Sequence, residues 1–194
     1  MGKTICIYAG SNLGINPEYV EKVNQLGEWI VARGYRIVYG GSSIGLMGEI
    51  ANKVLSLGGE VIGVMPKGLV LGEMAHQRLT KLVEVDGMHA RKEKMNELSD
   101  GFIALPGGIG TFDELFEILC WAQIGLHTKP IGLLNVAGYF DPLIALIRHS
   151  IDQGFANDSH LHLLTVSNDP QSLLDKMEAY VPPKLGNKWR QLSK

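Results

Sequence analysis

The chain has 194 residues, of which 45% are hydrophobic and 20% charged, and its formal net charge is −2. This length suits one domain with a substantial core, and the composition is ordinary for a globular protein. The near-neutral charge argues against a general nucleic-acid or anionic-membrane binder, but not against one bound nucleotide.

The cysteines and the N-terminal stretch bear on where the protein works. Cys6 and Cys120 form no Cys-x-x-Cys motif, so neither a disulfide framework nor a zinc knuckle is indicated. The opening stretch KTICIYAG predicts a strand rather than a signal peptide, and no run of 18 apolar residues predicts a membrane span. We therefore expect a cytoplasmic protein with no membrane partner and no nucleic-acid partner.

Short apolar runs alternate with amphipathic stretches along the chain. Strands are predicted at residues 4–9, 36–39, 60–65, 81–85, 101–105, 130–135 and 162–166. Helices are predicted at residues 17–33, 46–57, 88–99, 111–126, 141–153 and 170–180. This alternation predicts an α/β fold, a Rossmann-like doubly wound parallel sheet of about seven strands flanked by helices. We expect residues 1–180 to form one domain and residues 181–194 to be a peripheral tail.

Three predicted strands end in turns of small residues, and a ligand site is expected there. The turns are Gly10-Ser11, Gly40-Gly41-Ser42 and Pro106-Gly107-Gly108. In an open parallel sheet these turns share the carboxyl edge, where ligands bind at the point of strand reversal. Any single turn is equally well an ordinary βα connection. Together the three indicate a ligand the size of a nucleotide.

The glycine pattern excludes two familiar nucleotide sites. Gly108-x-Gly110 lacks the third glycine of the Rossmann fingerprint, and no G-K-[ST] motif occurs. A dinucleotide and an ATP hydrolysis mechanism are therefore disfavoured. Backbone N–H groups at residues 107–111 would still open a helix and attract a phosphate, aided by Ser11 or by Gly41-Ser42.

Glu114 follows this turn and has two interpretations. At about 100° per residue, Glu114 flanks the apolar stripe of its helix, whereas Asp113 and Glu117 lie on the far side. Thr111-x-x-Glu114 matches a capping box, in which the glutamate folds back to its own helix end. Alternatively, a carboxylate kept ionised by the helix N-terminus stabilises an oxocarbenium-like sugar or orients water.

Arg91 lies on the apolar face of the helix predicted at 88–99, beside Met95 and Leu98. A buried guanidinium needs an anionic partner. That partner is either a ligand phosphate, which matches the guanidinium fork, or a protein carboxylate such as Glu84.

Three further features carry weaker signals. His160-x-His162 is a two-histidine pattern that fits metal chelation or plain solvation, and we expect no metal site. Residues 120–126 are apolar nearly all round, which fits a buried core or, as we favour, a subunit interface. Residues 66–80 have no clear period, and long irregular segments are often functional. We include Glu73 and Arg78 of this segment among the substrate-binding residues.

The motifs together resemble the Lonely Guy family of cytokinin riboside 5'-monophosphate phosphoribohydrolases. PGGIGTFDE matches its P-G-G-x-G-T-x-x-E signature and GMHARKEKM its second motif, and YAGSN, YGGSSIGLMG and GVMPKGL are similar to further blocks. The resemblance spans residues 3 to 180 and is closest to bacterial members, whose relatives were formerly labelled "possible lysine decarboxylase". That label implies a pyridoxal phosphate lysine, for which the chain offers no context, so we reject it.

The resemblance implies an N-glycosidase that splits a nucleoside 5'-monophosphate into a free base and ribose 5-phosphate, without a cofactor, and a homodimer. The family's catalytic pair falls on Arg91 and Glu114. Its substrate contacts fall on Glu73, Lys92 and residues 108–114, which include Gly108, Gly110 and Thr111. Some relatives are linked instead to the molybdenum cofactor. A non-catalytic nucleotide or cofactor carrier is therefore the alternative, and a structural dimer with a vestigial site is a third.

Overall fold

The computed structural model describes residues 2–70 and 75–184. Its centre is a seven-stranded sheet in the order β4-β3-β2-β1-β5-β6-β7, and every neighbouring pair is parallel. The strands are β1 (Thr4–Tyr8), β2 (Arg36–Tyr39), β3 (Val61–Pro66), β4 (Lys81–Val85), β5 (Gly101–Ala104), β6 (Ile131–Leu134) and β7 (Leu164–Ser167). The predicted doubly wound α/β fold is confirmed.

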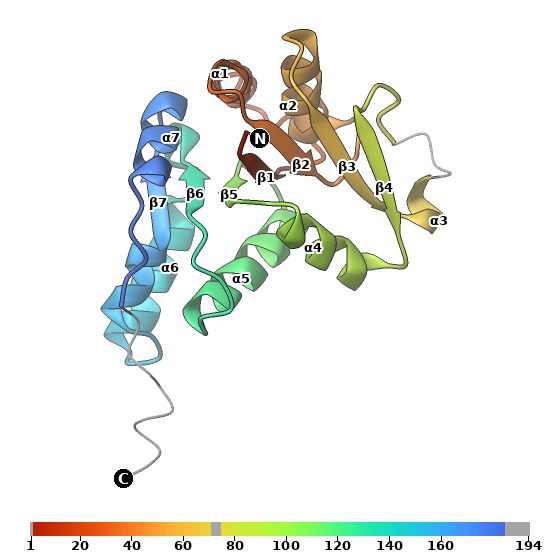
Figure 1. Ribbon diagram of the computed structural model, residues 1–194. Helices are drawn as coiled ribbons and strands as arrows, with labels where there is room; N and C mark the ends of the chain where they lie inside the picture. Colours follow the sequence, from red (N-terminus) through yellow and green to blue (C-terminus); the bar gives the residue numbers. More distant parts are fainter. Residues whose placement is uncertain (1, 71–74, 185–194) are drawn as a thin grey trace.

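Helices cover both faces of this sheet (Figure 1). They are α1 (Glu18–Ala32), α2 (Gly45–Ser56), α3 (Lys67–Val70), α4 (Met88–Glu97), α5 (Ile109–Gln123), α6 (Asp141–Asp152) and α7 (Pro170–Glu178), with short 3-10 helices η1 (Val136–Gly138) and η2 (Asp158–Leu163). One core cluster joins the sheet to α1, α2 and α7. A second joins it to α4, α5 and η2, with α6 packed at its margin.

The β1 strand shows how the sequence divides between the two cores. Ile5 and Ile7 pack into the α1 side, whereas Cys6 and Tyr8 pack into the α4 side. This alternation follows from the two-residue period of a strand, and all five residues of β1 are buried. Such a strand is typical of a central parallel position.

The strand order reverses between β1 and β5. Strands β2, β3 and β4 continue on one side of β1, and β5, β6 and β7 lie on the other. The carboxyl ends of β1 and β5 therefore meet at the switch point, where open α/β sheets place their ligands.

The structure differs from the sequence prediction at the start of one helix, α5, and at the start of one strand, β7. Helix α5 begins at Ile109, two residues before the predicted start. Strand β7 begins at Leu164 because residues Asp158–Leu163 form the 3-10 helix η2 instead.

No helix in the described ranges is long and apolar enough to cross a membrane. The division of the chain at residue 180 stays a prediction.

Candidate active site

The predicted small-residue turns meet at the carboxyl edge of the sheet. The Gly10 amide donates to the carbonyl of Pro106 at 3.0 Å, which joins the turns after β1 and β5. A Cβ on Gly10 would lie 3.0 Å from the Cα of Gly107, so the two backbones touch. Gly45, at the start of α2, has a φ of +61°, and a Cβ there would lie 2.2 Å from the carbonyl carbon of Ser11. Glycine is needed where the chain packs this closely.

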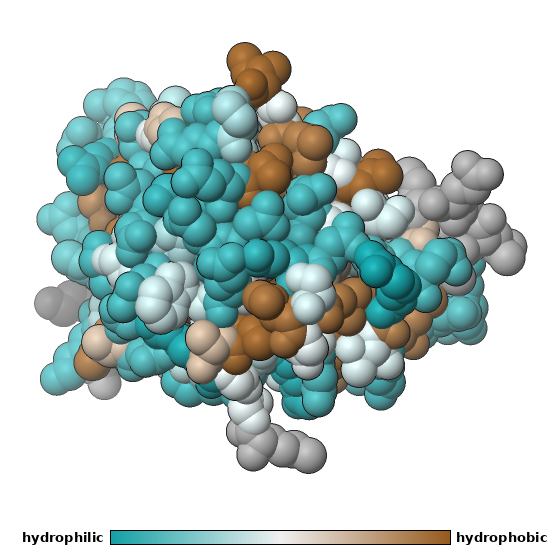
Figure 2. Space-filling view, turned by 90° about the horizontal axis from the view of Figure 1, so that it is seen from above, coloured by the Kyte–Doolittle hydropathy of each residue, from teal (hydrophilic) through white to brown (hydrophobic). Residues whose placement is uncertain are grey.

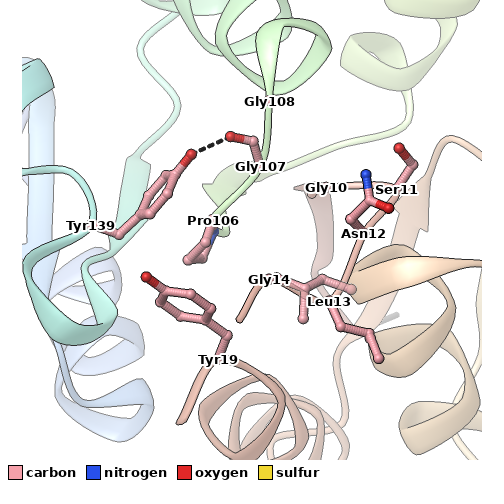
Figure 3. A pocket seen from close by; sticks show the side chains of 11 residues that line it. Gly10, Ser11, Asn12, Leu13, Gly14, Tyr19, Pro106, Gly107, Gly108 and Tyr139 are labelled. Carbon is pink, nitrogen blue, oxygen red and sulfur yellow. Dashed lines mark hydrogen bonds between the residues drawn. The ribbon is translucent and has the colours of Figure 1, made fainter. Parts of the chain in front are cut away.

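A cavity of about 200 Å³ opens at this junction (Figure 3). Its uncharged lining comprises Gly10, Ser11, Asn12, Leu13, Gly14, Tyr19, Leu46, Pro106, Gly107, Gly108 and Tyr139. The hydroxyl of Tyr139 donates to the carbonyl of Gly107, and its ring meets that of Tyr19 edge-on at 5.9 Å. Ser11, Gly107 and Gly108 were expected here. The two tyrosines come from α1 and the residue after η1, and the sequence offered no motif to reveal them.

The N-terminus of α5 is open at the rim of this cavity. The N-cap is Gly108, and no side chain in the described part of the chain caps it. Cβ atoms added at Gly108 and Gly110 would meet no described atom within 4 Å. The first amides of a helix have no partner within it and carry the positive end of the dipole. This helix end therefore presents free donors that suit an anion.

The capping-box interpretation of Thr111 and Glu114 is wrong. Because α5 begins at Ile109, Thr111 is the third helical residue and not the cap. Thr111 is buried. Its hydroxyl packs so close to Gly107 that a Cβ added to this glycine would lie 2.1 Å from the hydroxyl oxygen. Glu114 lies deeper in the helix and does not fold back to the N-terminus.

Glu114 pairs instead with Arg91 of α4. Nη2 of Arg91 lies 3.1 Å from Oε1 of Glu114, and the two side chains are only 13% and 11% exposed. Nε of Arg91 donates to the carbonyl of Val64 at 3.3 Å. The partner of Arg91 is therefore a protein carboxylate, as the second interpretation expected, but it is Glu114 and not Glu84. The two residues expected to be catalytic lie in direct contact, although neither is among the residues that line the cavity.

The surroundings of Glu114 set its protonation. Burial raises the pKa of Glu114 to about 7, Asp113 and Glu117 add to the rise, and the cations Arg91 and Lys92 oppose it. Burial also raises the pKa of the Cys6 thiol to about 12 and the pKa of Tyr8 well above its usual value. Both β1 groups are therefore neutral. A carboxyl group whose pKa lies near 7 is suited to exchange protons and to switch charge during a reaction.

Lys92, expected to contact substrate, is occupied by protein carboxylates. Its Nζ lies 3.2 Å from Oδ2 of Asp113 and 2.9 Å from Oε1 of Glu117, with the lysine side chain 13% exposed. The helical spacing placed Asp113 and Glu117 on the far side of the helix from the apolar stripe, but both contact α4 through Lys92, next to the Arg91–Glu114 pair. It did not reveal that they share a partner on α4, because that contact depends on how two helices cross.

Residues 75–78, just before β4, pack on the turn after β2 and on α2. The amide of His76 donates to the carbonyl of Gly41 at 2.9 Å, and Ser42 forms an isolated bridge with Ala75. Gly41 has a φ of +82°, which favours glycine. Arg78 donates from Nη2 to the side chain of Asn52 in α2 at 2.7 Å. Glu73, which was expected to bind substrate, lies outside the described residues.

Of the two histidines, His160 stabilises the start of η2. Nδ1 of His160 accepts from the amide of Asn157 at 3.2 Å, as part of a capping box at the start of η2. His160 is buried, whereas His162 is exposed. Within the described ranges no cluster of three or more His, Cys, Asp or Glu side chains is placed to hold a metal ion.

Fold and site together define a doubly wound α/β protein with an open helix N-terminus at its switch point and a buried arginine–glutamate pair beside it. A family model described as "Possible lysine decarboxylase" matches residues 47–177. A probable cytokinin riboside 5'-monophosphate phosphoribohydrolase from Oryza sativa subsp. japonica is 45% identical over 93% of this chain and 79% of its own length. A cytokinin riboside 5'-monophosphate phosphoribohydrolase from Arabidopsis thaliana is 43% identical over 93% and 84%. The chain belongs to this family, as its motifs predicted.

Solved structures share the fold at lower identity. A molybdenum cofactor carrier protein from Chlamydomonas reinhardtii superposes with a TM-score of 0.70 at 22% identity, over 93% of this chain and 98% of that one. A molybdenum cofactor binding protein from Rippkaea orientalis gives 0.68 at 18%, over 92% and 97%. Likeness at these identities establishes the fold alone.

Proposed function

We propose that this protein hydrolyses the N-glycosidic bond of a nucleoside 5'-monophosphate, a cytokinin riboside 5'-monophosphate or AMP, to a free base and ribose 5-phosphate. The observation that carries the proposal is the buried contact between Arg91 of α4 and Glu114 of α5, at 3.1 Å. Helix α5 is also the helix whose N-terminus is open to an anion. The names of the relatives at 45% and 43% identity support the same reaction.

The phosphate of the substrate belongs at the start of α5. The free amides at Gly108, Gly110 and Thr111 would receive its oxygens, aided by Ser11 or by Gly41-Ser42 at the neighbouring turns. The turn that leads into α5 needs a glycine at Gly107 because a Cβ there would strike the hydroxyl of Thr111 and the amide of Gly10. With the phosphate at the helix end, the ribose extends towards Glu114.

Glu114 and Arg91 then act on the sugar. As the C1'–N bond breaks, its electron pair leaves with the base, which takes up a proton from solvent, and positive charge develops at C1'; the proton that Glu114 later accepts from the attacking water returns to solvent. The ionised Glu114 stabilises that charge, positions a water for addition to C1' and accepts the proton it loses. Arg91 holds Glu114 and contacts the phosphate or sugar. Charge stabilisation of this kind is worth on the order of 10²–10³ in rate for each group. No step needs a metal or a redox cofactor.

The test is product release by the purified protein. Adenine from AMP, and isopentenyladenine from its riboside monophosphate, would be separated and quantified together with ribose 5-phosphate, at matched substrate concentrations. We expect equal amounts of base and sugar phosphate. Tight binding of AMP or of a pterin without product release would instead support a nucleotide or molybdenum-cofactor carrier, and no binding would support a structural protein with a vestigial site.

We also propose that the protein works as a homodimer through the surface formed by α5 and α6. Phe116, Ile124 and Leu126, at and just beyond the outer side of α5, are 40%, 63% and 68% exposed, and Leu146 of α6 is 60% exposed. No residue of α6, all of which the structure describes, is buried, although the helix is amphipathic. Exposed apolar surface of this extent marks a binding face.

Seen from above, the surface of the molecule is mostly hydrophilic, with several hydrophobic patches among the hydrophilic residues (Figure 2). A two-fold pairing of the α5–α6 surface would bury the exposed side chains of both copies.

We propose a cytoplasmic location, because Cys6 and Cys120 are both free thiols, which suits a reducing compartment.

A further inference from the structure

Two adjacent basic residues of α4 contact different carboxylates of α5. Arg91 meets Glu114, whereas Lys92 lies 3.2 Å from Asp113 and 2.9 Å from Glu117. Asp113 and Glu117 stand one residue before and three residues after Glu114, so the lysine spans the turn of α5 that carries Glu114. With its side chain 13% exposed and two carboxylates in reach, the Lys92 ammonium is already neutralised by protein groups.

Helix α4 also has contacts that do not involve α5: Nζ of Lys129 donates to the carbonyl and to the side-chain oxygen of Asn96 at 2.7 Å and 3.2 Å. Among its ten residues, all of which the structure describes, only Met95 is buried. Lys94 and Glu97 pair with each other on the outer side, where their side chains are 39% and 53% exposed. Arg91 itself adds one bond to the Val64 carbonyl at 3.3 Å. Met95 and Asn96 hold the C-terminal half of α4, whereas Arg91 and Lys92 join its N-terminal half to α5 through charged contacts.

We propose that Lys92 is a positioning residue, which holds α4 on α5 through Asp113 and Glu117 so that Arg91 stays opposite Glu114 when the substrate's anionic group competes for the guanidinium. This inference rests on the proposed function. It assigns Lys92 a role other than the substrate contact that the sequence led us to expect. Because the neighbouring lysine fixes this part of the helix, the guanidinium of Arg91 can contact the phosphate while it stays beside Glu114.

The same arrangement makes Lys92 part of the charge balance around Glu114. The groups that face this carboxyl are Arg91 and Lys92 from α4, Asp113 and Glu117 from α5, and the neutral Cys6 and Tyr8 from β1. Loss of the lysine charge leaves two uncompensated carboxylates beside Glu114 and raises its pKa. Loss of either carboxylate lowers that pKa. A lysine that did not lie beside these carboxylates would leave the pKa of Glu114 unchanged when its charge is removed.

The experiment compares Lys92→Met, Asp113→Asn and Glu117→Gln in the full chain, with AMP as substrate. We expect Lys92→Met to lower kcat by about tenfold to a hundredfold with little change in KM, because misplacing a catalytic group by about 1 Å costs this much. The acid limb of kcat/KM should move to higher pH in Lys92→Met and to lower pH in the two α5 variants. The charge exchange Lys92→Glu with Glu117→Lys should restore part of kcat.

The matched control is Lys94→Met, which removes a lysine from the outer side of α4 and should change neither kcat nor the pH profile. A large rise in KM at unchanged kcat in Lys92→Met would make Lys92 a substrate ligand and overturn the proposal. A fall in thermal stability with all pH profiles superimposed would overturn it too.

A second readout separates this inference from the proposed function. NMR titration of the ¹³C-labelled Glu114 carboxyl requires no turnover and should show the same opposite shifts in Lys92→Met and Glu117→Gln. If wild-type protein released no base yet these shifts appeared, the reaction would be wrong, whereas the charge coupling between Lys92 and Glu114 on which the positioning role depends would stand. If neither variant moved the Glu114 titration, the positioning role would be wrong whatever the activity.

Discussion

The guanidinium of Arg91 crosses directly over Gly40, the residue that follows β2. A Cβ added to Gly40 would lie 2.1 Å from Nη2 of Arg91, the nitrogen that contacts Glu114 at 3.1 Å. Gly40 belongs to the second of the three small-residue turns. Because it has no side chain, it leaves room for the Arg91 guanidinium rather than for a ligand phosphate.

Gly40→Ala should therefore impair the site without removing any charged group. The new methyl group pushes the guanidinium away from Glu114, and we expect kcat/KM for nucleotide hydrolysis to fall at least about tenfold. The end of a long side chain moves readily, so stability should change by only about 1–2 kcal/mol. Gly68→Ala is the matched control, since a Cβ there meets no described atom within 4 Å. Full activity in Gly40→Ala would show that the position of Arg91 is unimportant.

Glu114→Gln should separate binding from chemistry. The amide keeps the size of the side chain but cannot stabilise positive charge at C1', so kcat should drop by on the order of 10²–10³. Nucleotide affinity, measured by calorimetry, should stay within about threefold because the α5 amides are unchanged. Glu21→Gln on the exposed side of α1 controls for the loss of a carboxylate. Wild-type turnover by Glu114→Gln would remove this residue from the mechanism.

The raised pKa of Glu114, about 7, predicts opposite pH trends for activity and stability. Activity needs the ionised form, so kcat/KM should fall as the pH drops through about 7. Between the usual pKa of 4.5 and about 7, the folded state binds more protons than the unfolded state. The contribution of Glu114 to the free energy of unfolding therefore decreases as the pH rises through that window, by up to about 3 kcal/mol.

Urea unfolding of wild type and Glu114→Gln at pH 5 and pH 8 measures this contribution. Relative to the variant, the wild type should be more stable at pH 5 than at pH 8. An unchanged difference between the two proteins would mean that Glu114 titrates near its ordinary pKa, and that burial is balanced by Arg91 and Lys92.

Much of the fold was predictable because each element carries its own period. Short apolar runs correctly predicted β1 and β2, and amphipathic stretches correctly predicted α1 and α6. The predicted ends of these four elements lie within about two residues of the observed ends. The start of α5 was misplaced because Gly108 and Ile109 look like loop residues. Only the tertiary contacts of the turn, where Gly10 touches Gly107, fix the helix that early.

The site was predictable as a set of residue types but not as a geometry. The motifs led to Arg91 and Glu114, and periodicity placed each on an inward-leaning face. Their mutual contact, and the one between Lys92 and Glu117, join helices from different βα units. Such contacts depend on how α4 crosses α5, for which a single sequence holds no signal. Tyr19 and Tyr139 escaped notice for the same reason.

The α5–α6 surface gives the last prediction, on assembly. Leu126→Asp places a charge on a side chain that is 68% exposed in the single chain, so it should leave the fold of one copy intact. In a dimer the same charge would be buried without a partner, at a cost of several kcal/mol. We expect sedimentation velocity to show dimers of the wild type and monomers of Leu126→Asp at the same concentration. Leu57→Asp, at the end of α2 and 45% exposed, is the control and should remain dimeric. A monomeric wild type, or dissociation by Leu57→Asp alone, would place the interface elsewhere or remove it.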